Sequence, residues 1–183
     1  MARLPYLDRS SLKPEDQELL ARDINLHRIL VHNPAATRAF TALGGYIRHG
    51  TRLDPRLREL AILQVGWLAR SAYEWSHHVK IGHDFGVTDA DIEGLVAESR
   101  GEASRLEPLA RLVLRAAREI HDGPGVSAAT FAVLREALDE ASLMDLVVTA
   151  SFYCGVVRLL ASLEVEVEEG YMPYLRRHPL PAA

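Results

Sequence analysis

The sequence of 183 residues contains a single cysteine, Cys154, and this scarcity excludes several classes of protein. One thiol cannot form an intrachain disulfide, and it cannot build the cysteine cage of a structural zinc site. It also leaves a peroxidatic thiol without a resolving partner in the same chain. The chain is therefore unlike the disulfide-rich proteins of oxidising compartments.

Charge of one sign and long apolar runs are also scarce. The formal net charge is −4 and no basic block occurs, so nucleic acid is not an expected partner. No run approaches eighteen apolar residues, since Asp145 and Arg158 interrupt residues 143–163, and no membrane partner is expected. Residues 1–5 lack the apolar core of a signal peptide. We therefore expect a soluble, cytoplasmic protein.

Strand patterns are absent too, because no alternating segment is flanked by turn signals. Apolar residues instead recur at helical spacing between cap residues and Pro or Gly stops. The sequence predicts an all-α bundle of about seven or eight helices in one domain, residues 1–183. The expected helices cover residues 14–23, 34–49, 55–68, 72–85, a segment starting at 88, and residues 106–121, 127–138 and 139–164. Residues 37–122 form the core motif, residues 127–164 the C-terminal helices, and residues 165–183 a tail that packs along the surface or onto a neighbour.

Polar residues on two otherwise apolar helices are the most informative feature. Ser71, Glu74 and His78 recur at three and four residues and so share one helix face, and Glu59 lies on the preceding helix. Burying such groups unpaired is costly, so they are expected to be paired or used. His78 is the predicted acid–base, because an imidazole exchanges protons near neutral pH. Glu74 and Glu59 are its predicted partners.

The stretch from residue 58 to 86 resembles the carboxymuconolactone decarboxylase superfamily, which includes the AhpD-like alkylhydroperoxidases. The matching elements are RELAIL at 58–63, YEWSHH at 73–78 and GVT at 86–88, and the strongest resemblance covers about residues 37–90. The resemblance implies an AhpD-like helical bundle, homo-oligomers that are commonly trimers or hexamers, and, in the decarboxylase branch, activity without a cofactor.

The sequence departs from the peroxidase branch at the motif itself. AhpD-like peroxidases carry a Cys-x-x-Cys pair followed four residues later by His, whereas this chain has Ser71, Glu74 and His78 there. A hydroxyl and a carboxylate cannot cycle as thiols do. The leading hypothesis is a cofactor-independent lyase or isomerase that acts on a small carboxylated or lactone substrate. Decarboxylation, lactone isomerisation, and hydration or dehydration all stay open.

Residues around the motif supply the expected substrate contacts. Ser71, Arg52 and Tyr153 are the predicted substrate-binding residues, and Arg56 and Arg58 also flank the site and suit a substrate carboxylate. No metal is expected, although Glu59, Glu74 and His78 could hold one. Among the other polar residues, His77 is expected to be exposed or at an interface, His83 to lie on the surface, and the glutamates at 164, 166, 168 and 169 to form a solvated edge.

Two other functions stay open. One is an AhpD-like antioxidant protein that has lost the paired-cysteine mechanism and depends on Cys154. The other is a non-catalytic oligomeric binding module in which the histidine face is structural.

Overall fold

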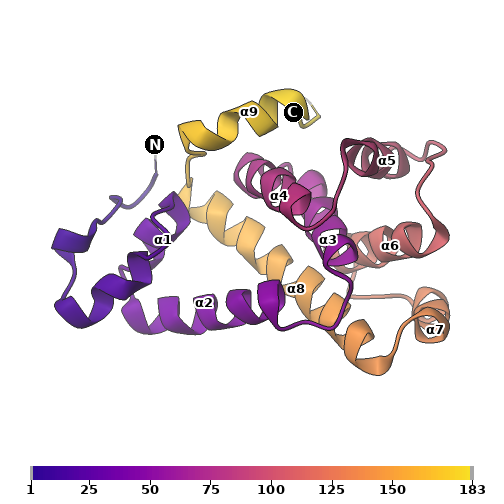
Figure 1. Cartoon of the computed structure of the whole chain (residues 1–183), viewed down its shortest axis with the longest axis horizontal. Helices are drawn as coiled ribbons and strands as arrows, with labels where there is room; N and C mark the ends of the chain where they lie inside the picture. The colour runs from indigo at the N-terminus through magenta and orange to yellow at the C-terminus, as the bar shows by residue number, and fades with distance from the viewer. Residues whose placement is uncertain (1, 182–183) are drawn as a thin grey trace.

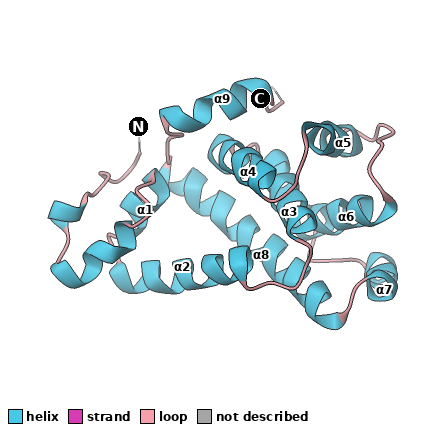
Figure 2. Ribbon diagram, in the orientation of Figure 1, coloured by secondary structure: helices cyan, strands magenta, loops and turns pink. Residues whose placement is uncertain are grey.

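The computed structural model describes residues 2–181, which consist of helices and loops without a strand (Figures 1 and 2). The nine α-helices in this range are α1 (Asn25–Leu30), α2 (Pro34–His49), α3 (Pro55–Leu68), α4 (Ala72–Asp84), α5 (Asp89–Ser99), α6 (Pro108–Asp122), α7 (Ala128–Ala137), α8 (Glu140–Leu163) and α9 (Met172–Arg177). Three 3₁₀ helices accompany them, η1 (Arg9–Ser11), η2 (Pro14–Leu20) and η3 (Glu169–Tyr171). The predicted all-α fold is confirmed.

Cap residues set most of the helix starts. Asn33, Asp54, Thr88, Ser127 and Asp139 each accept a hydrogen bond from a backbone N–H in the first turn of the helix that follows. These starts agree with the sequence prediction. The structure differs near the chain ends: residues 14–20 form a 3₁₀ helix, and the short helices α1 and α9 were not predicted. Six residues are too few to show a helical period.

Helix α3 is the centre of the fold. Every residue from Leu57 to Trp67 is buried, and α3 packs against α4, α5, α6 and α8. The near-continuous apolar sequence of this helix reflects burial on most sides. At its end, Trp67 packs on Trp75 of α4 with ring centroids 5.3 Å apart. The α3–α4 pair therefore holds the polar motif inside the core.

Helix α8 is long and apolar enough to cross a membrane by length and composition, but it packs against α3, α6 and α7. Both carboxylate oxygens of its buried Asp145 are hydrogen-bonded: one accepts from Tyr46 Oη at 2.7 Å and the other from the Arg52 backbone N–H at 2.6 Å. These contacts are those of a core helix in a soluble helical domain.

The C-terminal tail returns to the α4 side of the molecule, where α9 lies across α4 (Figure 1). Trp75 Nε1 donates a hydrogen bond to the backbone carbonyl of His178 at 2.6 Å. The tail thus packs on the surface of its own chain.

Candidate active site

His78 lies between two carboxylates from different helices. Its Nδ1 is 2.6 Å from Glu59 Oε2 on α3, and its Nε2 is 2.9 Å from Glu74 Oε1, one turn earlier on α4. All three side chains are at most 5% exposed. The i, i+4 spacing fixes the second contact, and the packing of α3 on α4 fixes the first.

A buried arginine holds the carboxylate behind the imidazole. Arg58 Nε and Nη2 donate to Glu59 Oε1 at 3.1 and 2.9 Å, and its guanidinium stacks over the Phe85 ring at 4.5 Å. Glu59 therefore uses one oxygen for Arg58 and the other for His78. Such a bidentate, desolvated pair fixes the carboxylate orientation.

The electrostatics of the trio favour a protonated imidazole. Burial disfavours the imidazolium, but the negative charges of Glu59 and Glu74 outweigh it and raise the pKa of His78 to about 9. Burial likewise acts to raise the pKa of Glu59, but His78 and Arg58 lower it below its ordinary value. At neutral pH the His78 ring is therefore expected to be an imidazolium that lies between the Glu59 and Glu74 side chains.

A cavity of about 210 Å³ opens on one side of this trio. An apolar cavity of 150 Å³ holds a benzene-sized ligand, so this space suits a small ring or a short acid. Glu74, His78 and Tyr153 are among its polar lining residues. Its apolar walls come from Ile24, Leu26, Phe40, Ile81, Phe152 and Val156.

Two arginines line the same cavity without an anionic partner. Neither the Arg22 nor the Arg48 side chain makes a hydrogen bond or an ion pair with another of residues 2–181. Desolvation and repulsion by the positive charge of Arg48 both lower the pKa of Arg22. Arg22 is exposed and Arg48 is half-buried, and guanidinium groups without a protein partner beside a cavity can bind a carboxylate or another anion.

The predicted substrate-binding residues have different positions. Tyr153 lines the cavity and packs edge-on to His78, with ring centroids 5.0 Å apart. Burial and the nearby Glu74 and Glu59 charges raise its pKa, so its hydroxyl stays a donor. Ser71 is the N-cap of α4 and does not line the cavity.

The flanking arginines of the motif do not reach the cavity. The Arg52 side chain is exposed and does not line the cavity, and its backbone N–H donates to Asp145 Oδ2 at 2.6 Å. Arg56 is bound by Asp91 and Glu107, with contacts of 2.5 and 2.6 Å. The sequence analysis chose these groups because they lie near the motif in the chain, whereas the cavity is lined by Arg22, in the bend before α1, and by Arg48 of α2.

His77 was expected to be exposed or at an interface, but the ring is buried within its own chain. It is 3% exposed and lies between the rings of Tyr73 and Tyr171, with centroid distances of 4.1 and 3.6 Å. Its Nε2 is 3.1 Å from Glu168 Oε2. The returning tail covers this face of α4, which a single helix pattern could not reveal.

Glu168 is a second correction, because it is not part of a solvated edge. One of its oxygens accepts from the Asn25 backbone N–H at 2.6 Å and from Tyr73 Oη at 3.0 Å. Burial opposes its ionisation, but the contacts with His77 and Asn25 lower its pKa to about 2. Glu168 therefore joins α1, α4 and the tail beside the cavity.

His27 is another residue that the sequence analysis missed. It lines the cavity, and its Nδ1 is buried without a hydrogen-bond partner among the described residues. Desolvation and the Arg22 charge lower its pKa to about 4, so the ring is neutral. The Gly44-Gly45 pair in α2 is the sequence feature that could have indicated a cavity next to this helix. Both glycines line the cavity, and the space beside each Cα is open.

No thiol lines the cavity among residues 2–181. Cys154 is buried in α8, and burial raises the pKa of its thiol. The groups that meet at the cavity are instead an imidazolium, a carboxylate, a phenol and two guanidinium groups. This set can donate and accept protons and bind an anion.

The comparisons with known proteins agree with this description. The sequence profile of the carboxymuconolactone decarboxylase family matches residues 34–119. No protein of curated function matches the chain significantly.

Three solved structures share the fold. An AhpD-core, peroxidase-related protein from Ralstonia eutropha JMP134 has a TM-score of 0.81 at 18% identity, with 95% of each chain covered. A peroxidase-related protein from Silicibacter sp. TM1040 has a TM-score of 0.76 at 21% identity, with 92% of each chain covered. The debrominase Bmp8, solved with 2,3,4-tribromopyrrole, has a TM-score of 0.77 at 14% identity and covers 97% of this chain and 99% of its own.

Proposed function

We propose that this chain, whose residues 34–119 match the carboxymuconolactone decarboxylase family and whose fold is shared with AhpD-like proteins, is a cofactor-independent acid–base enzyme of the lyase or isomerase type. Its substrate is a small carboxylated compound or a lactone. The observation that carries this proposal is the His78 imidazole, held between Glu59 and Glu74 at the wall of the cavity. A cytoplasmic location stays a prediction.

Arg48 and Arg22 give the substrate its orientation. An anionic oxygen of the substrate binds these two guanidinium groups, which have no partner within the described residues. The remainder of a small ring lies against Phe40, Phe152 and Val156. This orientation directs the reacting carbon toward Glu74 and His78, which line the cavity.

A decarboxylation then proceeds in two parts. The bond to the carboxyl carbon breaks, CO2 leaves into the apolar part of the cavity, and the electron pair remains on the substrate as an enolate or dienolate. The Glu74–His78 pair delivers one proton to the nucleophilic carbon, and His78 is reprotonated from water. Arg48 stabilises the charge on the enolate oxygen. An isomerisation would instead begin with removal of a proton from a substrate carbon by the Glu74–His78 pair, which leaves the electron pair on the substrate as an enolate or dienolate, and the same pair would then return a proton to a different carbon.

Glu59 and Arg58 act behind the imidazole. The Nδ1 contact with Glu59 holds the ring in one orientation and keeps it protonated, and Arg58 keeps Glu59 ionised. This arrangement gives the acid a defined direction before the substrate arrives. Glu59 does not line the cavity, so we assign it a positioning role.

The proposal is tested with a panel of small unsaturated carboxylic acids and lactones, including carboxymuconolactone, incubated in D2O and followed by NMR. Wild type should release CO2 from, or incorporate deuterium into, at least one compound. His78→Gln and Glu74→Gln should lower kcat by about 10²- to 10⁴-fold, the typical contribution of one acid–base group. An Arg52→Ala control should keep wild-type rates.

Two outcomes would contradict the proposal. One is a folded His78→Gln enzyme that works as fast as wild type. The other is the absence of both turnover and deuterium exchange across the panel. A folded state is established by circular dichroism. The pH profile adds a check, because activity that needs the imidazolium should fall as the pH rises through about 9.

A further inference from the structure

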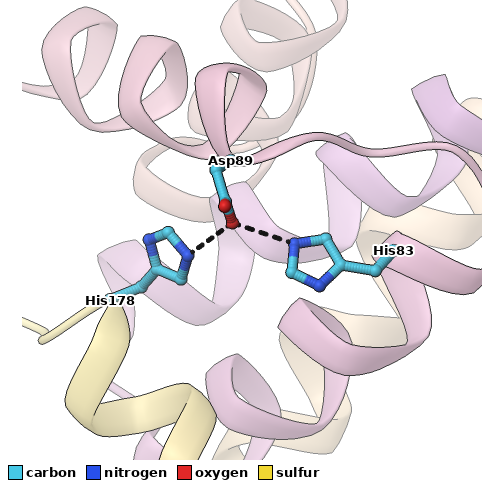
Figure 3. Close-up of side chains that lie close together, drawn as sticks. All are labelled: His83, Asp89 and His178. Carbon is cyan, nitrogen blue, oxygen red and sulfur yellow. Dashed lines mark hydrogen bonds and ion pairs between the residues drawn. The ribbon is translucent and has the colours of Figure 1, made fainter.

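Three ligand-type side chains that do not line the cavity meet where the ends of three helices come together. Figure 3 shows Asp89, in the first turn of α5, between the imidazoles of His83 from the end of α4 and His178 after α9. Asp89 Oδ1 is 3.2 Å from His83 Nε2 and 2.9 Å from His178 Nε2. One ligand atom from each residue lies within 4.8 Å of the others.

The donor set and its spacing fit a first-row divalent cation. Imidazole nitrogen and carboxylate oxygen are standard zinc ligands, with bonds of about 2.0–2.2 Å. Bonds of this length place neighbouring ligand atoms of a tetrahedron about 3.3 Å apart, and two of the three spacings here are already close to that. The geometry points to a zinc-type site with three protein ligands, His83, Asp89 and His178, and a fourth position for water.

The surroundings hold the ligands in place but leave the site reachable. Arg177 contacts the other oxygen of Asp89, Oδ2, which leaves Oδ1 directed at the two imidazoles. Trp75 fixes the backbone of His178. The three ligand side chains are 30%, 36% and 11% exposed in the order His83, Asp89 and His178. Outer contacts of this kind orient ligands in metal sites.

The charge of Arg177 sets the expected strength of the site. It offsets the negative charge of Asp89, and the ligands are one carboxylate and two neutral groups when metal is bound. We therefore expect weaker binding than in a cysteine cage, with competition from protons at acidic pH. The site would join the tail to the α4–α5 corner, so its role is to secure the tail rather than to act on substrate.

The test uses untagged protein, because a polyhistidine tag would bind the probe. Zn²⁺ affinity and stoichiometry are measured by competition with a chromophoric chelator, and Co²⁺ is added separately to record its visible spectrum. The variants are His83→Gln and His178→Gln. The matched control is His121→Gln. His121 also pairs with a carboxylate, Asp122 at 2.7 Å, but among the described residues no third His, Cys, Asp or Glu completes a metal-ligand group with this pair.

Wild type and His121→Gln should bind one Zn²⁺ per chain and give the intense band of tetrahedral Co²⁺. Each ligand variant should bind at least about tenfold more weakly, the minimum effect expected for disturbing a metal site. Ni²⁺ should quench Trp75, which contacts His178, in wild type and less in His83→Gln.

Clear results would overturn the assignment. Absence of stoichiometric Zn²⁺ binding by wild type would do so, as would equal affinity in His83→Gln and His121→Gln. His83→Gln is the decisive variant because the contacts of Asp89 with Arg177 and His178 remain, and the tail stays attached. Unchanged circular dichroism and melting temperature in metal-free buffer would verify that each variant is folded.

Discussion

At the scale of single residues, the pKa of His78 connects the site to stability. Folding raises this pKa from 6.5 to about 9, so the native state binds the proton more tightly than the unfolded chain. The resulting stabilisation is complete below about pH 6.5 and is lost as the pH rises through about 9. The site is thus expected to support the fold at neutral pH and to weaken it in alkali.

This linkage predicts a pH-dependent difference between wild type and His78→Gln. The excess unfolding free energy of wild type should decrease by about 3 kcal/mol between pH 6 and pH 10, at about 1.4 kcal/mol per pKa unit. Urea denaturation at a series of pH values measures it. Parallel curves for the two proteins would show that His78 has an ordinary pKa.

A second residue-scale prediction concerns the cavity arginines. Arg48→Ala should raise KM for an anionic substrate by about 10- to 100-fold, because a hydrogen bond to a charged group contributes about 1.5–3 kcal/mol. Arg48→Lys should restore part of the binding, since it keeps the charge but not the planar fork. Steady-state kinetics measure both. Arg52→Ala is the control, because that side chain is exposed outside the cavity.

If Arg52→Ala raised KM as much as Arg48→Ala does, the substrate would bind at the motif loop rather than in the cavity. An unchanged KM in both variants would exclude anion recognition by either arginine.

At the scale of elements, the start of α4 decides how the motif is presented. Ser71 is its N-cap and accepts from the Glu74 backbone N–H at 3.4 Å, and the helix then directs Glu74 and His78 toward α3. The hydroxyl at this position therefore holds a helix end. If Ser71 acts as a cap, its loss should lower the unfolding free energy. If it contacts the substrate, its loss should raise KM.

Ser71→Ala should lower the unfolding free energy by about 1 kcal/mol, the usual cost of losing a cap. Ser71→Asp should retain stability, because Asp is an equally good N-cap. Thermal denaturation gives the stabilities, and kinetics on the same samples give KM. A large rise in KM for Ser71→Ala, with stability unchanged, would instead assign the hydroxyl to the substrate.

At the scale of the whole molecule, one surface region has the features of an interface between copies of the chain. Leu43 and Tyr46 on α2 and Met144 on α8 are 38%, 47% and 61% exposed. The Tyr46 hydroxyl bonds to Asp145 at 2.7 Å, which brings the two helices together there. Adjacent exposed apolar side chains of this size are typical of interaction surfaces.

We therefore predict a homo-oligomer, a trimer or hexamer as the family resemblance implies, with this region at a subunit contact. Light scattering coupled to size exclusion measures the mass. Met144→Glu should shift the mass toward the monomer, because a charge would be buried at the contact. An exposed-site control such as Glu136→Gln should leave it unchanged. A monomeric wild type would contradict the prediction.

The sequence by itself determined the helical architecture, most helix starts and the central trio. Asn33, Asp54 and Asp139 act locally, since a cap needs only its own first turn. Glu74 and His78 meet for a similarly local reason, their i, i+4 spacing. The sequence also predicted that Glu59 joins them, because buried carboxylates on two neighbouring apolar helices are costly unless they are paired.

Tertiary structure alone decided the rest of the cavity. Arg22, His27 and Arg48 come from segments whose local patterns are those of ordinary surface residues, and only tertiary packing brings them to the cavity beside α4. The tail likewise buries His77 and carries His178 to Asp89. Helical periodicity shows which side of a helix is apolar, but it does not show which distant segment covers that side. That depends on packing between residues far apart in the chain.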